Sequence, residues 1–218
     1  MGGDCRRWRG QVQLCYRLAM NTLFRPPNLP LTSQAAEGLM RRRWSVAEIE
    51  AIVEAGILLE DERFELIGGE IVPMSPRGNQ HEILKGSLLR YWAKRLRDEF
   101  SFIPETTFRI TPDTFLEPDF VFYRTADTVV NLRPETALLV VEIANSSLGY
   151  DLGRKASLYA QFGITELWVI NAVTFETHIH RNPNSSQYDE VSKVSGDKVL
   201  HAAFAPELDV KLQELKLA

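Results

Sequence analysis

The sequence is poor in cysteine: its 218 residues contain only Cys5 and Cys15. Two thiols confined to the start of the chain argue against a disulfide scaffold and against a cysteine-based zinc site. No stretch approaches 18 consecutive apolar residues, so the sequence predicts no transmembrane helix and no membrane partner. The long cysteine-free remainder is typical of an intracellular protein, and we expect a cytoplasmic location.

An excess of positive charge is also missing, because 25 Lys and Arg oppose 29 Asp and Glu, a net charge of -4. A protein held on DNA by bulk positive charge would have the opposite balance, although a locally basic cleft stays compatible with nucleic acid. With 44% hydrophobic and 25% charged residues, the composition is that of an ordinary globular domain. At about 150 residues per domain, the length predicts one domain with a sizeable core, plus an appendage.

The first forty residues differ in composition from the rest, since they hold five basic and two acidic residues. The proline-rich run 25–30 excludes a helix or a central strand there. We therefore expect an N-terminal extension over 1–40, disordered or loosely packed, and a domain over 41–218. An organelle transit peptide, a nucleic-acid-binding arm, and an internal start at Met20 or Met40 remain open alternatives.

Secondary-structure signals are dense from residue 44 onward. Ser45 and Glu48 form a capping box before a short helix that Gly56 ends. Gly68-Gly69 divides 64–72 into a hairpin. Apolar spacing predicts helices at 81–99 and 152–162 and strands at 101–103, 107–110, 120–123, 138–143, 166–170, 177–180 and 187–194. The order predicts an α/β (α+β) fold with one mixed sheet and helices packed against it.

Two carboxylates occupy unusual positions. Glu142 lies near the end of the apolar run 138–143, which reads as a strand buried on both faces. A carboxylate buried there requires a basic group, a metal ion or a proton beside it. Asp119 follows Pro118 at the entrance of another apolar strand; the alternative is an ordinary aspartate in a turn.

A third polar element is the pair Asp151 and Lys155, four residues apart on one face of the predicted helix. An exposed surface pair worth about 0.3–0.5 kcal/mol is one interpretation. The other is that the short strand–loop–helix connection directs Lys155 back towards the Glu142 strand. Two carboxylates with a lysine suit Mg²⁺ or Mn²⁺, which activate a bound water for attack on a phosphoryl group.

At these residues the chain resembles the Uma2 family, restriction-endonuclease-like proteins of the PD-(D/E)XK superfamily that are abundant in cyanobacteria. The matching segments, in chain order, are 64–71, 73–76, His81, 118–119, 140–143, 145–147, Asp151, Lys155, 159–160, 163–164 and 166–170. Together they cover most of the chain outside the N-terminal segment.

The resemblance implies a restriction-endonuclease-like mixed central sheet flanked by helices, and Mg²⁺-dependent hydrolysis of phosphodiester bonds, with DNA as substrate and a homodimer as assembly. It implies that Asp119 and Glu142 bind the metal, together with the backbone carbonyl of Ile143. The superfamily lysine normally lies two residues after the second acid, where this chain has Ala144, and Lys155 matches a lysine that has migrated to the next helix. Glu65 matches an upstream acid, with a plain hairpin residue as the alternative.

Other residues are weaker candidates. His81 is either a site residue or a capping or surface residue, and Ser146 either caps the helix or contacts the site. His178 and His180 fit an exposed strand face, and Tyr159 and Trp168 fit the core. Gly68 stands where the family often has Asp. A non-catalytic binding or regulatory module that retains the fold is the main rival function, and an enzyme acting on RNA or another phosphate ester is the second.

Overall fold

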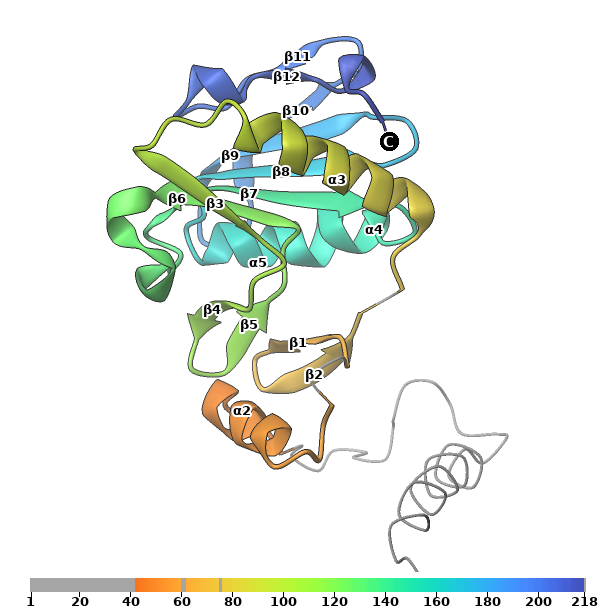
Figure 1. Ribbon diagram of the computed structural model, residues 1–218. Helices are drawn as coiled ribbons and strands as arrows, with labels where there is room; N and C mark the ends of the chain where they lie inside the picture. Colours follow the sequence, from red (N-terminus) through yellow and green to blue (C-terminus); the bar gives the residue numbers. More distant parts are fainter. Residues whose placement is uncertain (1–41, 60–61, 75, 218) are drawn as a thin grey trace, which may run out of the picture. The chain divides into compact units, whose positions relative to one another are not determined.

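The computed structural model describes residues 42–59, 62–74 and 76–217 (Figure 1). From Arg43 onward the chain forms one compact unit. The predicted extension over 1–40, with its two cysteines and its candidate start sites, lies outside the described residues. Among the described helices, none is long and apolar enough to cross a bilayer.

A six-stranded mixed sheet is the centre of the fold. Its spatial order is β10 (Tyr188–Val194), β9 (Thr177–Pro183), β8 (Glu166–Asn171), β7 (Ala137–Ala144), β6 (Phe120–Arg124) and β3 (Phe100–Pro104). The β7–β8 pair is parallel, and the other neighbours in this sheet are antiparallel. A parallel pair needs a crossover connection, and the helical segment between β7 and β8 provides it. The mixed central sheet predicted from the sequence is confirmed.

Helices cover both faces of this sheet (Figure 1). One face packs on α3 (Asn79–Ala93), whose Leu84, Leu88 and Trp92 meet Phe120, Phe122, Leu139 and Val141. The other face packs on a continuous helical segment made of α4 (Leu148–Tyr150), η3 (Asp151–Lys155) and α5 (Ala156–Gln161). Because side chains alternate along a strand, Leu139 and Val141 of β7 face α3, and Val140 and Ala144 face α5.

The helix expected over 81–99 is α3, which begins at Asn79 and ends at Ala93. The sequence pattern extended too far because Leu96 continues the apolar spacing. Leu96 does pack against the core, but from a turn in which its N–H donates to the Trp92 carbonyl. The helix expected over 152–162 likewise starts earlier, at Leu148.

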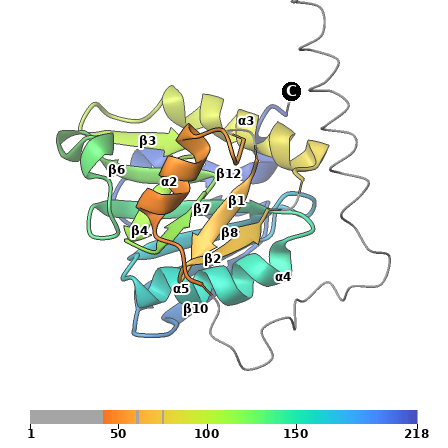
Figure 2. The same cartoon turned by 90° about the horizontal axis from the view of Figure 1, so that it is seen from below.

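The prediction of a single sheet is wrong, since the hairpin belongs to a separate four-stranded sheet. Its order is β2 (Glu70–Pro73), β1 (Phe64–Ile67), β5 (Thr114–Leu116) and β4 (Phe108–Thr111). The predicted hairpin pairs as expected, but a hairpin pattern is local and does not say which strand it pairs with next. The three-residue β5 was missed because it is too short to show a period. Figure 2 shows this small sheet and α2 on the same side of the molecule.

The capping box predicted at Ser45 and Glu48 is present at the start of α2 (Val46–Glu54), which packs on the small sheet through Val46, Ile49, Leu66 and Phe115. Near the other end of the chain, β11 (Val199–Leu200) pairs with β12 (Val210–Lys211) within the chain. Short 3₁₀ turns complete the described structure: η1 (Thr125–Asp127), η2 (Val129–Asn131), η4 (Pro206–Leu208) and η5 (Leu212–Glu214).

Candidate active site

The register of β6 and β7 brings Asp119 and Glu142 together. Phe120 lies opposite Val141 and Val121 opposite Val140 in this antiparallel pair, so one further step places Asp119 opposite Glu142. The Ile143 N–H donates to Asp119 Oδ2 over 2.7 Å. Both carboxylates are buried, with 4% of each residue exposed. The paired ends of two central strands thus hold two acidic groups in the protein interior, where their ionisation depends on their partners.

Lys155 reaches these strand ends from the helical crossover. Its Nζ lies 2.8 Å from Glu142 Oε1 and 2.9 Å from Glu65 Oε1, and the residue is 3% exposed. Lys155 ends the single π-helical turn η3 that begins at Asp151, and such turns are frequent at functional sites. Asp151 is also buried, so the interpretation of these two residues as an exposed surface pair is wrong.

Glu65 belongs to the site and not to the outside of the hairpin. It lies on β1 with 2% of the residue exposed, and its Oε1 accepts a hydrogen bond from the Glu117 N–H over 3.1 Å in addition to contacting Lys155. Glu65 therefore ties the small sheet to the segment that leads into Asp119.

Tyr159 completes the inner contacts, because its hydroxyl donates to Glu142 Oε1 over 2.6 Å. The expectation of a core residue is correct for its ring, which is fully buried, but it missed this hydrogen bond. The spacing of four residues from Lys155 was the available signal. Burial raises the pKa of the Tyr159 hydroxyl well above its usual value, and the charge of Glu142 adds to the rise, so Tyr159 stays a donor.

Crowding of carboxylates governs the charge of the site. Burial, opposed by Lys155 and reinforced by Asp151, Asp119 and Glu65, raises the pKa of Glu142 to about 8. Burial raises the pKa of Asp151 as well, against the opposing effects of Lys155 and a hydrogen bond with Ser147. The carboxylates outweigh the single ammonium group, whose own pKa is raised despite burial because of Glu142, Glu65 and Asp151. The cluster therefore favours an additional positive charge.

His81 contacts Asp119 from α3 and is buried, so a surface position for His81 is excluded. Its Nε2 lies 2.9 Å from Oδ1 and 3.0 Å from Oδ2 of Asp119, and its Nδ1 lies 3.2 Å from Glu82 Oε1. The helix cap is Gly78, three residues earlier. Burial would raise the pKa of Asp119, but His81, the Ile143 amide and Arg77 outweigh it and hold that pKa below its ordinary value.

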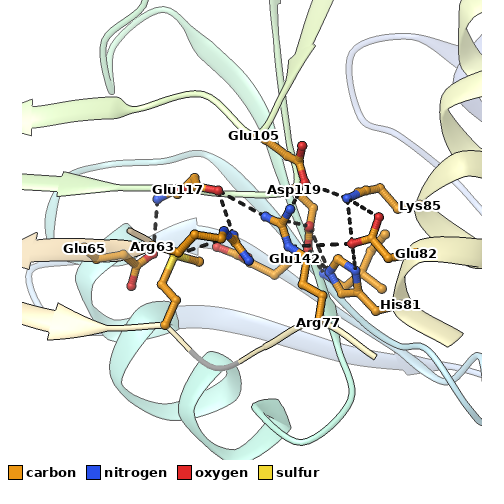
Figure 3. Close-up of polar contacts among 12 residues, drawn as sticks. Arg63, Glu65, Arg77, His81, Glu82, Lys85, Glu105, Glu117, Asp119 and Glu142 are labelled. Atoms are coloured by element: carbon orange, nitrogen blue, oxygen red, sulfur yellow. Dashed lines mark hydrogen bonds and ion pairs between the residues drawn. The ribbon is translucent and has the colours of Figure 1, made fainter. Parts of the chain in front are cut away.

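A cavity of about 330 Å³ opens onto these residues. Besides Glu65, Asp119, Glu142, Asp151 and Lys155, it is lined by Arg63, Arg77, Glu117, Ser146 and Tyr150, among others. Figure 3 shows Arg77 and Arg63 beside Glu117 and Asp119. Sequence reasoning missed both arginines because neither lies in a hydrophobic period or a recognisable spacing.

The residue pattern matches a known family. A family model described as "Uma2: Putative restriction endonuclease" matches residues 51–213, which include Glu65, Asp119, Glu142 and Lys155. The chain belongs to the Uma2 family.

A solved structure supports the fold of this Uma2 protein. The crystal structure of "a putative nuclease belonging to DUF820" from Anabaena variabilis aligns with 78% of this chain and 96% of that chain, with a TM-score of 0.58 and 14% identity. At this identity the match shows the fold alone, a nuclease fold with a mixed sheet. Comparison with curated proteins gives no match.

The donor atoms of this Uma2 site fit a small divalent cation held by few protein ligands. Within the described ranges, no three His, Cys, Asp or Glu side chains already form a metal-binding group. Mg²⁺ usually takes only one or two carboxylates and keeps several waters, so a larger group is not required. Asp119 Oδ1 is buried and, among the described residues, has no hydrogen-bond partner of good geometry, because His81 directs its bond to Oδ2. Of the two Asp119 oxygens, Oδ1 is therefore the one with room left to accept a metal, although His81 Nε2 also lies 2.9 Å from it.

Three other predicted candidates lie away from the cavity lining. His178 and His180 stack on β9 with ring centroids 6.4 Å apart, and His180 is buried although an exposed face was expected. Trp168 lies in the core as predicted, where its Nε1–H donates to Glu166 over 2.8 Å.

Ser146, in contrast, lines the cavity. Ser147 is the residue that precedes the helix, and it makes no side-chain cap.

Proposed function

We propose that this protein is a metal-dependent nuclease that hydrolyses phosphodiester bonds in DNA, with Mg²⁺ as its ion and Mn²⁺ as a substitute. The observation that carries the proposal is the position of Lys155, buried between Glu65 and Glu142 in the cavity that Asp119 also lines. Membership of the Uma2 family supports the reaction class. An ammonium group beside two carboxylates at the end of a sheet is suited to phosphoryl chemistry.

Each residue has a proposed role. Asp119, through Oδ1, and Glu142 would hold the ion, with the Ile143 carbonyl as the further ligand that the family resemblance implies. A bound ion of this kind supplies an activated water and neutralises charge on the phosphoryl group. Lys155 would orient the attacking water and offset the charge that develops. Tyr159 fixes Glu142 by its hydrogen bond, and Glu65 holds Lys155 in position.

A cleavage assay tests the proposal. Supercoiled plasmid and single-stranded DNA are incubated with purified protein in Mg²⁺, Mn²⁺ or EDTA, and RNA serves as a third substrate. We expect nicking that EDTA abolishes and that Asp119→Asn and Lys155→Met reduce by about 100-fold or more. The matched controls are Asp189→Asn and Lys193→Met, which change exposed residues of β10.

The outcomes separate the candidate functions. Cleavage unaffected by Asp119→Asn and Lys155→Met contradicts the proposed site. A folded protein that binds Mn²⁺ without cleaving any substrate favours the non-catalytic module. Preference for RNA over DNA would change the substrate and keep the mechanism. We also propose a homodimer in the cytoplasm, because paired active sites can cut two strands; light scattering of the purified protein tests the assembly.

A further inference from the structure

Two arginines converge on a single carboxylate oxygen at the rim of the cavity. Arg63 Nη2 lies 2.7 Å from Glu117 Oε1, and Arg77 Nη2 lies 3.2 Å from the same atom. Both guanidinium groups line the cavity that contains Asp119, Glu142 and Lys155. Figure 3 shows the contacts of both arginines with Glu117. Glu117 Oε1 is thus shared by the two guanidinium groups.

Arg77 is the more deeply placed of the two. It also contacts Glu105, lies 3.9 Å from Glu82 Oε1, and lies 3.8 Å from Asp119 Oδ1. Its side chain is 16% exposed, and that of Arg63 is 31% exposed. Arg77 thus links the ion pairs with Glu82 and Glu105 to Asp119, which belongs to the inner cluster of buried carboxylates formed with Glu65, Glu142 and Asp151. Both arginines remain reachable from the cavity.

The two arginines provide positive charge next to the buried carboxylates, which would otherwise repel a polyanionic substrate. A polyanion that approaches Glu65, Asp119, Glu142 and Asp151 is repelled by them, and the whole chain has a net charge of -4. Binding of nucleic acid therefore requires local positive charge beside the cluster. The planar guanidinium group is suited to phosphate, because its parallel N–H donors match two oxygens of one phosphate.

We propose that Arg63 and Arg77 bind a backbone phosphate of the nucleic-acid substrate, and that Glu117 occupies the position of this phosphate in the free protein. The inference rests on the proposed function, because it deepens how that site takes its substrate. The phosphate oxygen replaces Glu117 Oε1 between the two guanidinium groups. The contact of Arg77 with Asp119 then sets this phosphate next to the proposed metal ligands.

The proposal differs measurably from a purely structural ion pair. If the arginines bind phosphate, replacing them weakens binding of nucleic acid, whereas replacing Glu117 strengthens it because the carboxylate that competes with the phosphate for both guanidinium groups is removed. If they only support the fold, both kinds of change alter stability and leave binding alone. The sign of the Glu117 effect is therefore the most informative result.

The test is fluorescence anisotropy with a labelled 20-base-pair duplex of arbitrary sequence (about two helical turns), measured over a series of salt concentrations in EDTA and in Ca²⁺. We expect Arg63→Gln and Arg77→Gln each to weaken binding by about tenfold. Each should also reduce the slope of log K against log salt by about 1. Glu117→Gln should tighten binding several-fold, and Arg77→Lys, which keeps the charge but loses the fork, should fall between Arg77→Gln and the wild type.

Arg109 and Glu50 provide the matched control, since they form an exposed ion pair between β4 and α2 outside the cavity lining. Arg109→Gln and Glu50→Gln make the same changes of net charge. The proposal is overturned if the cavity arginines affect binding no more than Arg109 does, or if Glu117→Gln tightens binding no more than Glu50→Gln. Failure of the wild type to bind the duplex in either buffer overturns it too. Thermal melts of every variant identify any that do not fold, and Arg63 and Arg77 each provide an independent test.

Failure of this inference and failure of the proposed function are distinguishable, because binding in EDTA needs no turnover. If binding changes as expected but the protein cuts nothing in Mg²⁺, the phosphate site is supported and the nuclease proposal is contradicted. If the protein cuts DNA but neither its binding nor its salt slope changes when the arginines are replaced, the nuclease proposal is supported and the phosphate site is contradicted.

Discussion

The Nζ atom of Lys155 lies 2.8 Å from Oε1 of Glu142, in the interior of the protein. Glu142 comes from β7, and Lys155 comes from the continuous helical segment that follows it, at the end of the π-helical turn η3, so the short connection between strand and helix fixes their contact. A buried charge is tolerated only with a partner, which gives Lys155 a structural task besides its proposed role in catalysis. Mutations can separate the two tasks.

The structural task predicts a large loss of stability on removing the lysine alone. Lys155→Met leaves Glu142 and Glu65 without their buried cation and should cost about 3 kcal/mol in the free energy of unfolding at pH 9, which lies above the pKa of Glu142. The double variant Glu142→Gln/Lys155→Met removes the unpaired charge with it and should recover at least half of this loss, without recovering cleavage. Urea denaturation measures both. Equal instability of the single and double variants would contradict the pairing.

The raised pKa of Glu142 predicts that the stability of the protein in EDTA depends on pH. Its pKa of about 8 lies above the ordinary value of 4.5, so between these values the folded protein holds a proton that the unfolded chain has released. Stability from this group is therefore complete at low pH and is lost as pH rises from about 5 to 8, by up to about 1.4 kcal/mol per pH unit.

The measurement compares the wild type with Glu142→Gln, which cannot titrate. The wild type should lose stability relative to the variant across this range, and a saturating divalent cation should reduce the loss, because it favours the charged carboxylate. Parallel curves for the two proteins in EDTA would show that Glu142 is not the group responsible.

The lowered pKa of His180 predicts that stability rises with pH, opposite to the effect of Glu142, in a more acidic range. Burial, with a contribution from the charge of His178, lowers its pKa from 6.5 to about 4. Between about pH 6.5 and pH 4 this histidine is protonated in the unfolded chain but stays neutral in the folded protein. Stability is therefore lost as pH falls through this range. His180 Nε2 has no hydrogen-bond partner among the described residues, which makes phenylalanine a suitable replacement. We expect His180→Phe to retain more stability than the wild type at pH 5, measured by thermal unfolding; a common slope for both proteins would reject this.

Much of the fold was readable from local patterns, and the site was readable only in part. The capping box at Ser45 and the hairpin at Gly68-Gly69 are properties of neighbouring residues, which the sequence displays directly. The adjacency of Asp119 and Glu142 depends on the register between β6 and β7, which tertiary pairing sets. Glu142 was identifiable because a charge in an apolar strand is anomalous, and Lys155 because it follows that strand on a short helical connection and matches the lysine of the family resemblance. Arg63 and Arg77 were not, since an arginine near a loop is common and its partner Glu117 is distant in sequence.

The hairpin glycines provide a prediction about the turn that carries Glu65 into the site. Both have left-handed backbone, with φ of 57° at Gly68 and 79° at Gly69. Among the described residues, no atom lies within 4 Å of a Cβ added to Gly68, whereas one added to Gly69 would lie 2.6 Å from Arg43 Cβ and 3.0 Å from the Arg43 Cα. Asn and Asp tolerate left-handed backbone better than most residues that carry a side chain.

We therefore expect Gly68→Asn to change the free energy of unfolding by less than about 0.5 kcal/mol, since its side chain meets open space and its φ is accessible. Gly69→Asn should cost about 2 kcal/mol or more, because the same side chain collides with the backbone that leads into α2. The two variants make one substitution at adjacent positions, so each controls for the other in urea denaturation. If Gly69→Asn also lowers cleavage while Gly68→Asn does not, the hairpin positions Glu65 through its packing on Arg43; equal stability of both variants would contradict the close approach.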